Sequence, residues 1–293
     1  MKQLVVLSGK GGTGKTTVAA ALAQLAGRSL IADCDVEAPN LHLVLKPSVT
    51  RAYTLKVSSK AEIDPEKCDR CGICEDSCRF EAIRAFRVDP YACEGCGLCA
   101  RLCPVQAVEL VEREGAEVLL GETPYGPLVW ARLAVGEEAS GKVVSQVRME
   151  AQALAAEKGY DLLVVDGSPG IGCPVIASVT GADLALMVAE PTLSGRHDLL
   201  RALQTASFFR IPSLVCINKC DINVEEAKRI RDASTAMGVE VVAEIPYLEE
   251  LAEAARLSML PLEAANGDIA ALFRQLFERV MERMDARATP PKS

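Results

Sequence analysis

The stretch GKGGTGKT, residues 9–16, decides the fold class of this chain. It matches the pattern G-x-x-x-x-G-K-[ST], a glycine loop that follows a strand, opens a helix and surrounds phosphate groups. The apolar run QLVVLS, residues 3–8, lies before it, and the alanine-rich run TVAAALAQLAG, residues 17–27, lies after it. These segments therefore predict the strand–loop–helix unit in which such a loop binds a nucleotide.

The residue types of this loop suit the phosphates of a nucleotide. Glycines allow backbone N–H groups to face phosphate oxygens, and the start of the helix adds positive potential. We expect Lys15 to reach the β- and γ-phosphates and the hydroxyl of Thr16 to bind Mg²⁺. The predicted nucleotide-binding residues of the loop are Gly11, Gly12, Thr13, Gly14, Lys15, Thr16 and Thr17.

Apolar runs alternate with helical patterns over much of the remaining chain. Strands are expected at YDLLVVD, residues 160–166, at ADLALMVAE, residues 182–190, and at PSLVCIN, residues 212–218. Helices are expected near residues 143–158 and 198–209. This alternation indicates a mostly parallel sheet with helices on both faces, so we expect an α/β fold of the P-loop NTPase type.

Eight of the twelve cysteines form two runs with the spacing C-x2-C-x2-C-x3-C. The runs belong to an internal repeat, because residues 63–83 match residues 88–108 with every cysteine aligned. This is the spacing of bacterial ferredoxins, in which the fourth cysteine of each run ligates the other cluster. The predicted [4Fe–4S] ligands are Cys68, Cys71, Cys74 and Cys103 for one cluster, and Cys78, Cys93, Cys96 and Cys99 for the other.

Zinc is the alternative metal for these thiolates, since it also accepts four of them. Zinc sites usually combine two C-x-x-C pairs a dozen or more residues apart, and this arrangement differs from a triplet with a distant fourth cysteine. The chain has two histidines, which leaves little material for mixed sites. We therefore expect iron–sulfur clusters, which would also cross-link a segment of about 50 residues with little core of its own.

A change of composition marks the expected domain organisation. From about residue 60 the chain becomes rich in cysteine and charge, and the α/β pattern returns near residue 141. We expect a discontinuous P-loop ATPase domain at residues 1–59 and 113–287, interrupted by a small α+β ferredoxin-type domain at residues 60–112. Residues 288–293 are expected to form a flexible tail.

Charge and hydropathy exclude several classes of protein. The net charge of -8 argues against non-specific binding to nucleic acid or to an anionic membrane surface. No run of about 18 apolar residues predicts a membrane span, and the N-terminal segment lacks a signal-peptide pattern. We expect a cytoplasmic protein without stable membrane insertion, in which cysteines serve as metal ligands or buried thiols rather than disulfides.

The glycine loop contains a second lysine, Lys10, in addition to Lys15, and this pair of lysines indicates a family. The pattern resembles the deviant P-loop of the MinD/ParA family, which also includes the nitrogenase iron protein and the arsenite-pump ATPase. The resemblance implies a homodimer with ATP at its interface, in which Lys10 reaches the phosphates of the partner. A solvated surface lysine is the alternative for Lys10.

Two acidic stretches resemble the switch regions of the same family. DCDVEAPN, residues 33–40, matches the first switch, and the resemblance implies that Asp35 orients or activates the attacking water and helps to hold Mg²⁺. LLVVDGSPGIG, residues 162–172, matches the second, which implies that Asp166 binds a water of the Mg²⁺ ion. The alternative role of Asp166 is that of a helix N-cap.

The stretch NKCD, residues 218–221, concerns the base of the nucleotide. It formally matches the N-K-x-D pattern of GTPases, in which the acid reads guanine. In the MinD-like family the asparagine contacts adenine instead, and a segment equivalent to that around Pro246 borders the base. The resemblance favours ATP over GTP, with Asn218, Asp221 and Pro246 as the predicted base-side residues.

Together, the two regions resemble MinD-superfamily ATPases that carry an inserted two-cluster ferredoxin domain. We expect nucleotide-driven switch motion to gate electron delivery, or iron–sulfur or metallocofactor assembly, on a partner protein. One alternative is a carrier or scaffold of iron–sulfur clusters, which the absence of a C-x-x-C pair after Cys99 argues against. The other is a spatial regulator like MinD, which would need a membrane-targeting tail.

Overall fold

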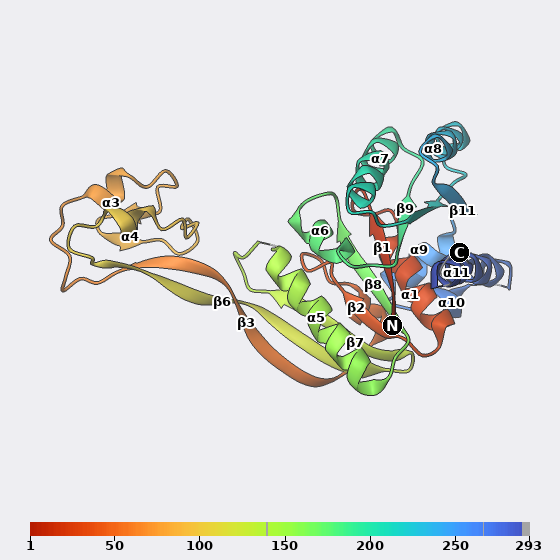
Figure 1. Ribbon diagram of the computed structural model, residues 1–293, viewed down its shortest axis with the longest axis horizontal. Coiled ribbons are helices and arrows are strands. Elements are labelled where there is room, and N and C mark those ends of the chain that lie inside the picture. The colour runs from red at the N-terminus through yellow and green to blue at the C-terminus, as the bar shows by residue number, and fades with distance from the viewer. Residues whose placement is uncertain (139, 266, 289–293) are drawn as a thin grey trace, which may run out of the picture. The chain divides into compact units, whose positions relative to one another are not determined.

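The computed structural model describes residues 1–138, 140–265 and 267–288, and it divides into two compact units. The sheet unit comprises residues 1–52 and 118–132 and the described residues from 140 onward. The cysteine unit comprises residues 53–117 and 133–138. Figure 1 shows the elements of both units in the order of the chain. No helix in the described ranges is long and apolar enough to cross a membrane.

A mostly parallel sheet forms the centre of the sheet unit, in the strand order β11-β10-β9-β1-β8-β2-β7-β6-β3. Every pairing from β11 to β7 is parallel. The strands β3 and β6 divide their residues between the two units. The bounds are β1 (Lys2–Ser8), β2 (Leu30–Asp33), β3 (Ser48–Ile63), β6 (Val108–Thr123), β7 (Gly126–Leu133), β8 (Leu162–Pro169), β9 (Leu184–Ala189), β10 (Ser213–Asn218) and β11 (Glu240–Ile245).

The register of the central strands brings the predicted functional segments to one edge of the sheet. In the parallel pairing of β2 with β8, Asp33 lies beside Asp166. In the pairing of β1 with β8, Val6 is also opposite Asp166, so the glycine loop begins just beyond the same row. Because the carboxyl ends of parallel strands share an edge, both switch regions and the glycine loop meet there.

Helices cover this sheet, and strands and helices together form its core (Figure 1). One buried cluster joins Leu4 and Val6 of β1, Leu22 of α1, and Phe273 and Leu276 of α11. These strands are apolar on both faces, as expected for parallel strands that are covered on both sides. The helices are α1 (Lys15–Ala26), α2 (Leu41–Leu45), α5 (Gly141–Lys158), α6 (Cys173–Val179), α7 (Leu193–Phe208), α8 (Val224–Ala236), α9 (Glu249–Arg256), α10 (Pro261–Ala264) and α11 (Gly267–Ala288).

The cysteine unit repeats one short motif. Two helices, α3 (Ile73–Asp76) and α4 (Leu98–Leu102), contact each other, and each follows a glycine with positive φ. The strands β4 (Ile83–Arg84) and β5 (Arg87–Val88) form an antiparallel pair between them in the chain.

Backbone hydrogen bonds follow the sequence repeat of this unit. The N–H of Asp64 donates to the carbonyl of Ala107 at 2.8 Å, and the N–H of Asp89 donates to that of Ala82 at 2.7 Å. Asp64 and Asp89 are equivalent in the repeat, as are Ala82 and Ala107. Each half of the repeat therefore donates one backbone hydrogen bond to the other half. The predicted domain limits stay a prediction, and residues 289–293 of the predicted tail lie outside the described residues.

Candidate functional site

The glycine loop joins β1 to α1 and lines a cavity of about 540 Å³. Gly12 and Gly14 have φ values of 81° and 91°, which side chains with a Cβ rarely adopt, and a Cβ on Gly14 would strike Asn218. Of the predicted loop residues, Thr13 is buried beneath the cavity. The others line it: Gly11, Gly12, Gly14, Lys15, Thr16 and Thr17.

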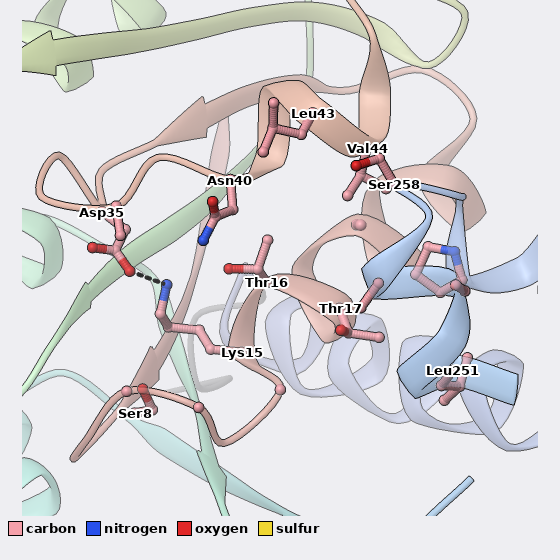
Figure 2. A pocket seen from close by; sticks show the side chains of 18 of the residues that line it. Ser8, Lys15, Thr16, Thr17, Asp35, Asn40, Leu43, Val44, Leu251 and Ser258 are labelled. Atoms are coloured by element: carbon pink, nitrogen blue, oxygen red, sulfur yellow. Dashed lines mark ion pairs between the residues drawn. The ribbon is translucent and has the colours of Figure 1, made fainter. Parts of the chain in front are cut away.

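The predicted magnesium residues converge around Lys15 in this cavity. The Lys15 ammonium lies 2.7 Å from Asp166 and 3.3 Å from Asp35, and Figure 2 shows it pointing at Asp35. The hydroxyl of Thr16 donates to the other oxygen of Asp166 at 2.7 Å. Asp166 lies within β8, and α6 begins only at Cys173, so its alternative role as a helix N-cap is excluded.

Asp33 is a member of this group that the sequence did not single out for a role. It is fully buried, and its two oxygens accept the backbone N–H groups of Asp35 at 3.1 Å and of Leu41 at 3.0 Å. Asp33 therefore holds the segment between β2 and α2, the predicted first switch, in place. The sequence alone could not show this role, because the position of Asp33 opposite Asp166 depends on the register of the folded sheet.

The electrostatics of the group favour an added cation. Burial would lower the pKa of Lys15, but Asp166, Asp35 and Asp33 outweigh it, and the pKa is raised. Burial raises the pKa of Asp33, and the charge of Asp166 raises it further. Burial likewise raises the pKa of Asp35, against the opposing charge of Lys15. Three carboxylates share one ammonium, so a divalent cation would offset the excess negative charge.

The protein side of this site fits Mg²⁺ bound with a nucleotide. No group of three His, Cys, Asp or Glu side chains in the part of the chain that the structure describes is arranged to hold a metal ion by itself. Mg²⁺ in phosphate-loop sites takes most of its ligands from water and phosphate oxygens, with one hydroxyl and one carboxylate from the protein. Thr16 and Asp166, whose side chains are 2.7 Å apart, are the hydroxyl and carboxylate that would hold the ion.

A second cavity of about 340 Å³ lies on the base side of the loop, and Asn218 and Pro246 both line it. The Asn218 amide donates to the carbonyl of Thr13 at 2.8 Å, which ties this side to the glycine loop. Asp221 does not line the cavity; its carboxylate accepts the backbone N–H of Tyr247 at 2.5 Å. The structure therefore uses Asp221 to hold the segment that carries Pro246.

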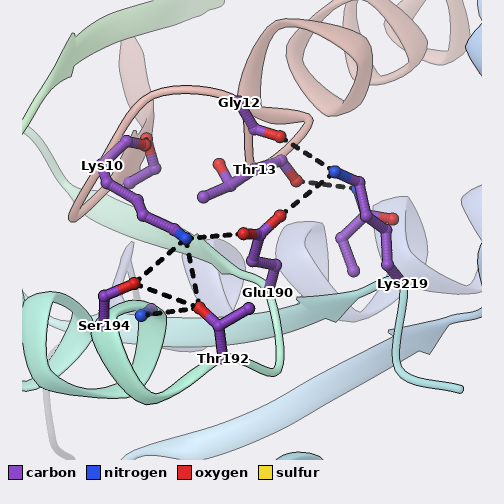
Figure 3. Close-up of polar contacts among 10 residues, drawn as sticks. Lys10, Gly12, Thr13, Glu190, Thr192, Ser194 and Lys219 are labelled. Carbon is purple, nitrogen blue, oxygen red and sulfur yellow. Dashed lines mark hydrogen bonds and ion pairs between the residues drawn. The ribbon is translucent and has the colours of Figure 1, made fainter. Parts of the chain in front are cut away.

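Lys10 lies on the other side of the loop, in a group of contacts shown in Figure 3. Its ammonium is 2.6 Å from Glu190 and lies within hydrogen-bond distance of the hydroxyls of Thr192 and Ser194. Glu190 also binds Lys219 at 3.1 Å. The sequence did not single out Glu190, which belongs to no motif, and it named Lys219 only as part of the stretch NKCD, without a role.

The eight cysteines of the two runs line two separate small cavities of the cysteine unit. Each cavity has three cysteines from one run and the last cysteine of the other run. The first set is Cys68, Cys71, Cys74 and Cys103, and the second is Cys78, Cys93, Cys96 and Cys99. All eight are free thiols.

Backbone donors point at the sulfurs of these cavities. The N–H of Ala107 donates to Cys103 Sγ at 3.2 Å, and the N–H of Ala61 donates to Cys93 Sγ at 3.5 Å. A tetrahedral ion with Zn–S bonds of about 2.3 Å requires its four sulfurs to be ~3.8 Å apart, whereas a four-iron cluster binds one thiolate at each of four separate irons. Each cavity is lined by four thiols, the number that either a zinc ion or a four-iron cluster binds.

Comparisons with known proteins agree on the sheet unit. The model of the family "CbiA: CobQ/CobB/MinD/ParA nucleotide binding domain" matches residues 4–262. The uncharacterized protein MJ0578 of Methanocaldococcus jannaschii is 39% identical over 224 residues, which cover 75% of this chain and 79% of that protein.

Solved structures share the fold. The MinD cell division protein of Aquifex aeolicus is 20% identical, with a TM-score of 0.57 over 96% of this chain and 98% of that one. The ATP complex of Cyanothece McdA(D38A) is 18% identical, with a TM-score of 0.56 over 97% and 96% of the two chains. At these identities the likeness establishes the fold alone.

Proposed function

The chain belongs to the CobQ/CobB/MinD/ParA family of nucleotide-binding P-loop ATPases, and on this premise we propose that it is an ATP-hydrolysing iron–sulfur protein. Its predicted family and its α/β fold with a mostly parallel sheet are confirmed. The proposal adds two [4Fe–4S] clusters, whose redox state is coupled to the nucleotide state. The coupled activity is electron delivery to a partner protein, or metallocofactor assembly on it.

The nucleotide half of the proposal assigns roles to the residues of the larger cavity. Lys15 neutralises phosphate charge, while Thr16 and Asp166 hold Mg²⁺, which stabilises the charge that develops on the phosphates. Asp35 orients the attacking water. Binding of a nucleotide with its cation would weaken the two ion pairs of Lys15, because the cation would be a second positive neighbour for each carboxylate.

The observation that carries the iron–sulfur half is the exchange of the fourth cysteine between the two cavities. Each cavity takes Cys78 or Cys103 from the opposite run, as in two-cluster ferredoxins. The N–H groups of Ala61 and Ala107 would hydrogen-bond to ligand sulfurs, a contact that tunes cluster potential. Bound clusters would supply one-electron transfer, and the thiols would hold them within a small apolar shell.

Chain connectivity supports coupling between the two halves. The carboxylate of Asp33 accepts the N–H of Leu41, the first residue of α2. Only two residues separate the end of α2 at Leu45 from the start of β3 at Ser48, and β3 continues as one strand to Ile63. A movement of the first switch would therefore reach the cysteine unit through a short covalent path. We also propose a homodimer with ATP at its interface, since Lys10 occupies the loop position from which, by the MinD/ParA resemblance, a lysine reaches the phosphates of the partner.

ATP turnover in defined cluster states tests the coupling. The rate is to be measured anaerobically with the clusters oxidised, reduced with dithionite, and removed by a chelator. We expect the rate of ATP turnover to change with the state of the clusters, because the first switch is joined to the cysteine unit through α2 and β3. Identical rates in all three states would contradict the coupling.

A MinD-like or ParA-like role is equally compatible with the ATPase fold and with the division and partition proteins that share it. In that case the cysteine unit would serve as a binding module, and purified protein would hold little iron. A cluster carrier would contain iron but transfer it to an apo-acceptor. Retention of iron in the presence of an apo-ferredoxin separates the proposed function from both.

A further inference from the structure

Lys10 is held by its own subunit through three oxygen partners (Figure 3). Its ammonium lies 2.6 Å from Glu190, 3.1 Å from the hydroxyl of Thr192 and 3.3 Å from that of Ser194. All three partners come from the junction between β9 and α7. These contacts satisfy the donor positions of an ammonium, so Lys10 is directed toward Glu190, Thr192 and Ser194 of its own subunit.

The junction itself is firmly held, so these contacts are not those of a loose surface lysine. Thr192 caps α7 by accepting the N–H of Gly195 at 2.9 Å. Gly9, the first residue of the loop, has no room for a Cβ, which would strike Asp198 of α7. The loop and the helix are therefore packed together next to Lys10.

Glu190 connects Lys10 with a second lysine. Its other oxygen lies 3.1 Å from Lys219, which in turn donates to the carbonyl of Gly12 at 3.0 Å. Lys219 has a φ of 56°, a left-handed conformation that costs energy in a residue with a side chain and that persists where the surroundings hold it. The carboxylate of Glu190 therefore connects Lys10, at the start of the glycine loop, with Lys219, after β10. Lys219 in turn contacts Gly12 in the middle of the loop.

The charge of this group matters because phosphates would bind next to it. Burial would raise the pKa of Glu190, but hydrogen bonds from Lys10 and Lys219, together with their charges, outweigh burial and lower the pKa. Glu190 is thus anionic at neutral pH. It is 17% exposed at its side chain and Lys10 is 27% exposed, so their attraction is less screened than that of a surface pair.

We infer that Glu190 is a positioning residue, which holds Lys10 against its own subunit and gives it up only to the phosphates of a nucleotide. On this inference the carboxylate of Glu190, which lies 2.6 Å from the ammonium, and a phosphate compete for one cation. Without nucleotide, Lys10 is retained; with ATP, it becomes available to the partner subunit. The inference deepens the proposed function, since it rests on the ATP-dependent homodimer.

The contact within the subunit is tested first without nucleotide. The rate at which an acetylating reagent modifies Lys10 is to be followed by peptide mass spectrometry in the full-length protein. Glu190→Gln keeps the shape but removes the charge, and its amide nitrogen cannot accept from a lysine. We expect Lys10 to react on the order of fivefold faster in this variant, because its ion pair with a carboxylate is replaced by at most a hydrogen bond to a neutral amide oxygen.

Glu240→Gln is the matched control. Glu240 is also a partly buried carboxylate between two cations, Arg279 and Arg283, but it lies on β11 away from the glycine loop. We expect it to leave the Lys10 rate unchanged. An equal Lys10 rate in Glu190→Gln and the wild type would overturn the inference.

The competition is tested next with Mg²⁺ and a non-hydrolysable ATP analogue, by measuring self-association in the analytical ultracentrifuge and turnover with ATP. Glu190→Gln is expected to associate at about fivefold lower analogue concentration and to show a similar fall in KM, with kcat within about twofold, because the competitor of the phosphates is weakened. A loss of kcat without a fall in KM would overturn the positioning role.

The two tests separate this inference from the proposed function. Failure of the wild type to associate with the analogue contradicts the proposed dimer, whatever the reactivity of Lys10. An unchanged Lys10 reactivity in Glu190→Gln contradicts the contact within the subunit, whatever the association state.

Discussion

The sheet unit and the cysteine unit are stabilised in different ways. In the sheet unit, large side chains such as Leu4, Leu22 and Phe273 are almost wholly buried in one cluster of strands and helices. The buried cluster of the cysteine unit consists of Ala61, Ala82, Cys93 and Val108, which are small by comparison. Because stabilisation grows with the apolar area buried, the first unit can fold on its own core. On the proposed function, the second would depend on the clusters that its thiols hold.

The largest effect is expected from removing one thiol of each cavity. The double variant Cys74→Ser, Cys99→Ser is expected to lose most of its iron and the fold of the cysteine unit, because a segment of about 50 residues seldom folds without such cross-links. Iron analysis and limited proteolysis measure this, with new cleavage expected within residues 53–117. ATP binding by the sheet unit should persist.

Cys173→Ser is the control, since Cys173 is an exposed thiol of the sheet unit. It should retain the wild-type iron content. Full iron in the double variant would contradict the assignment of the two cavities.

The second effect concerns the apolar core of the sheet unit. Phe273 is 1% exposed, and Phe273→Ala should lower the free energy of unfolding of the sheet unit by about 3–5 kcal/mol through lost burial and a cavity. Denaturant titration of far-UV circular dichroism measures it. Phe208→Ala is the control, because Phe208 is 80% exposed and its loss should change the value by less than about 0.5 kcal/mol. Equal effects of the two variants would contradict this description of the core.

The third effect concerns catalysis, and it should leave the folds of both units unchanged. Asp35→Asn should lower the rate of ATP hydrolysis by roughly 10²–10⁴-fold, because a neutral amide orients and activates the attacking water less well than a carboxylate does. Nucleotide affinity and iron content should stay near wild type. Asp232→Asn, on the exposed face of α8, is the control and should hydrolyse ATP normally. Wild-type turnover in Asp35→Asn would remove Asp35 from the mechanism.

The smallest effect is electrostatic. Burial would raise the pKa of Glu240, but Arg283 and Arg279 outweigh burial and lower it from its ordinary value of 4.5. The folded state therefore binds this proton less readily than the unfolded state, so the stabilisation is present above pH 4.5 and is lost as the pH falls through the lower folded value.

Glu240→Gln should cost the sheet unit less than about 1 kcal/mol at pH 7, because the carboxylate is partly exposed to solvent. The difference from wild type should shrink as the pH is lowered through the range in which Glu240 becomes protonated. Thermal unfolding at a series of pH values measures it. A difference that grows in acid would have the wrong sign for this ion pair.

Local patterns predicted the parts of the site that are contiguous in sequence. The loop from Gly9 to Thr16 is one such part, because its strand, glycines and helix follow one another directly. The grouping of the eight cysteines was also predictable, since the repeat defines which fourth cysteine belongs to which run. The structure places the cysteines in those two groups.

Contacts between distant segments were not predictable in the same way. Asp33 meets Asp166 through strand register, and Glu190 meets Lys10 across 180 positions of sequence. Asp221 stays a prediction as a base-side residue, and the motif did not reveal that its carboxylate accepts a backbone N–H of Tyr247. A motif states which chemistry a side chain has, and the fold decides what that side chain faces.

The proposed function requires two iron–sulfur clusters in the cysteine unit. The iron and acid-labile sulfide content of full-length protein purified without oxygen measures them most directly. About eight irons and eight sulfides per chain are expected, from two four-iron clusters. Protein that holds zinc, or that lacks sulfide when purified in this way, would contradict it.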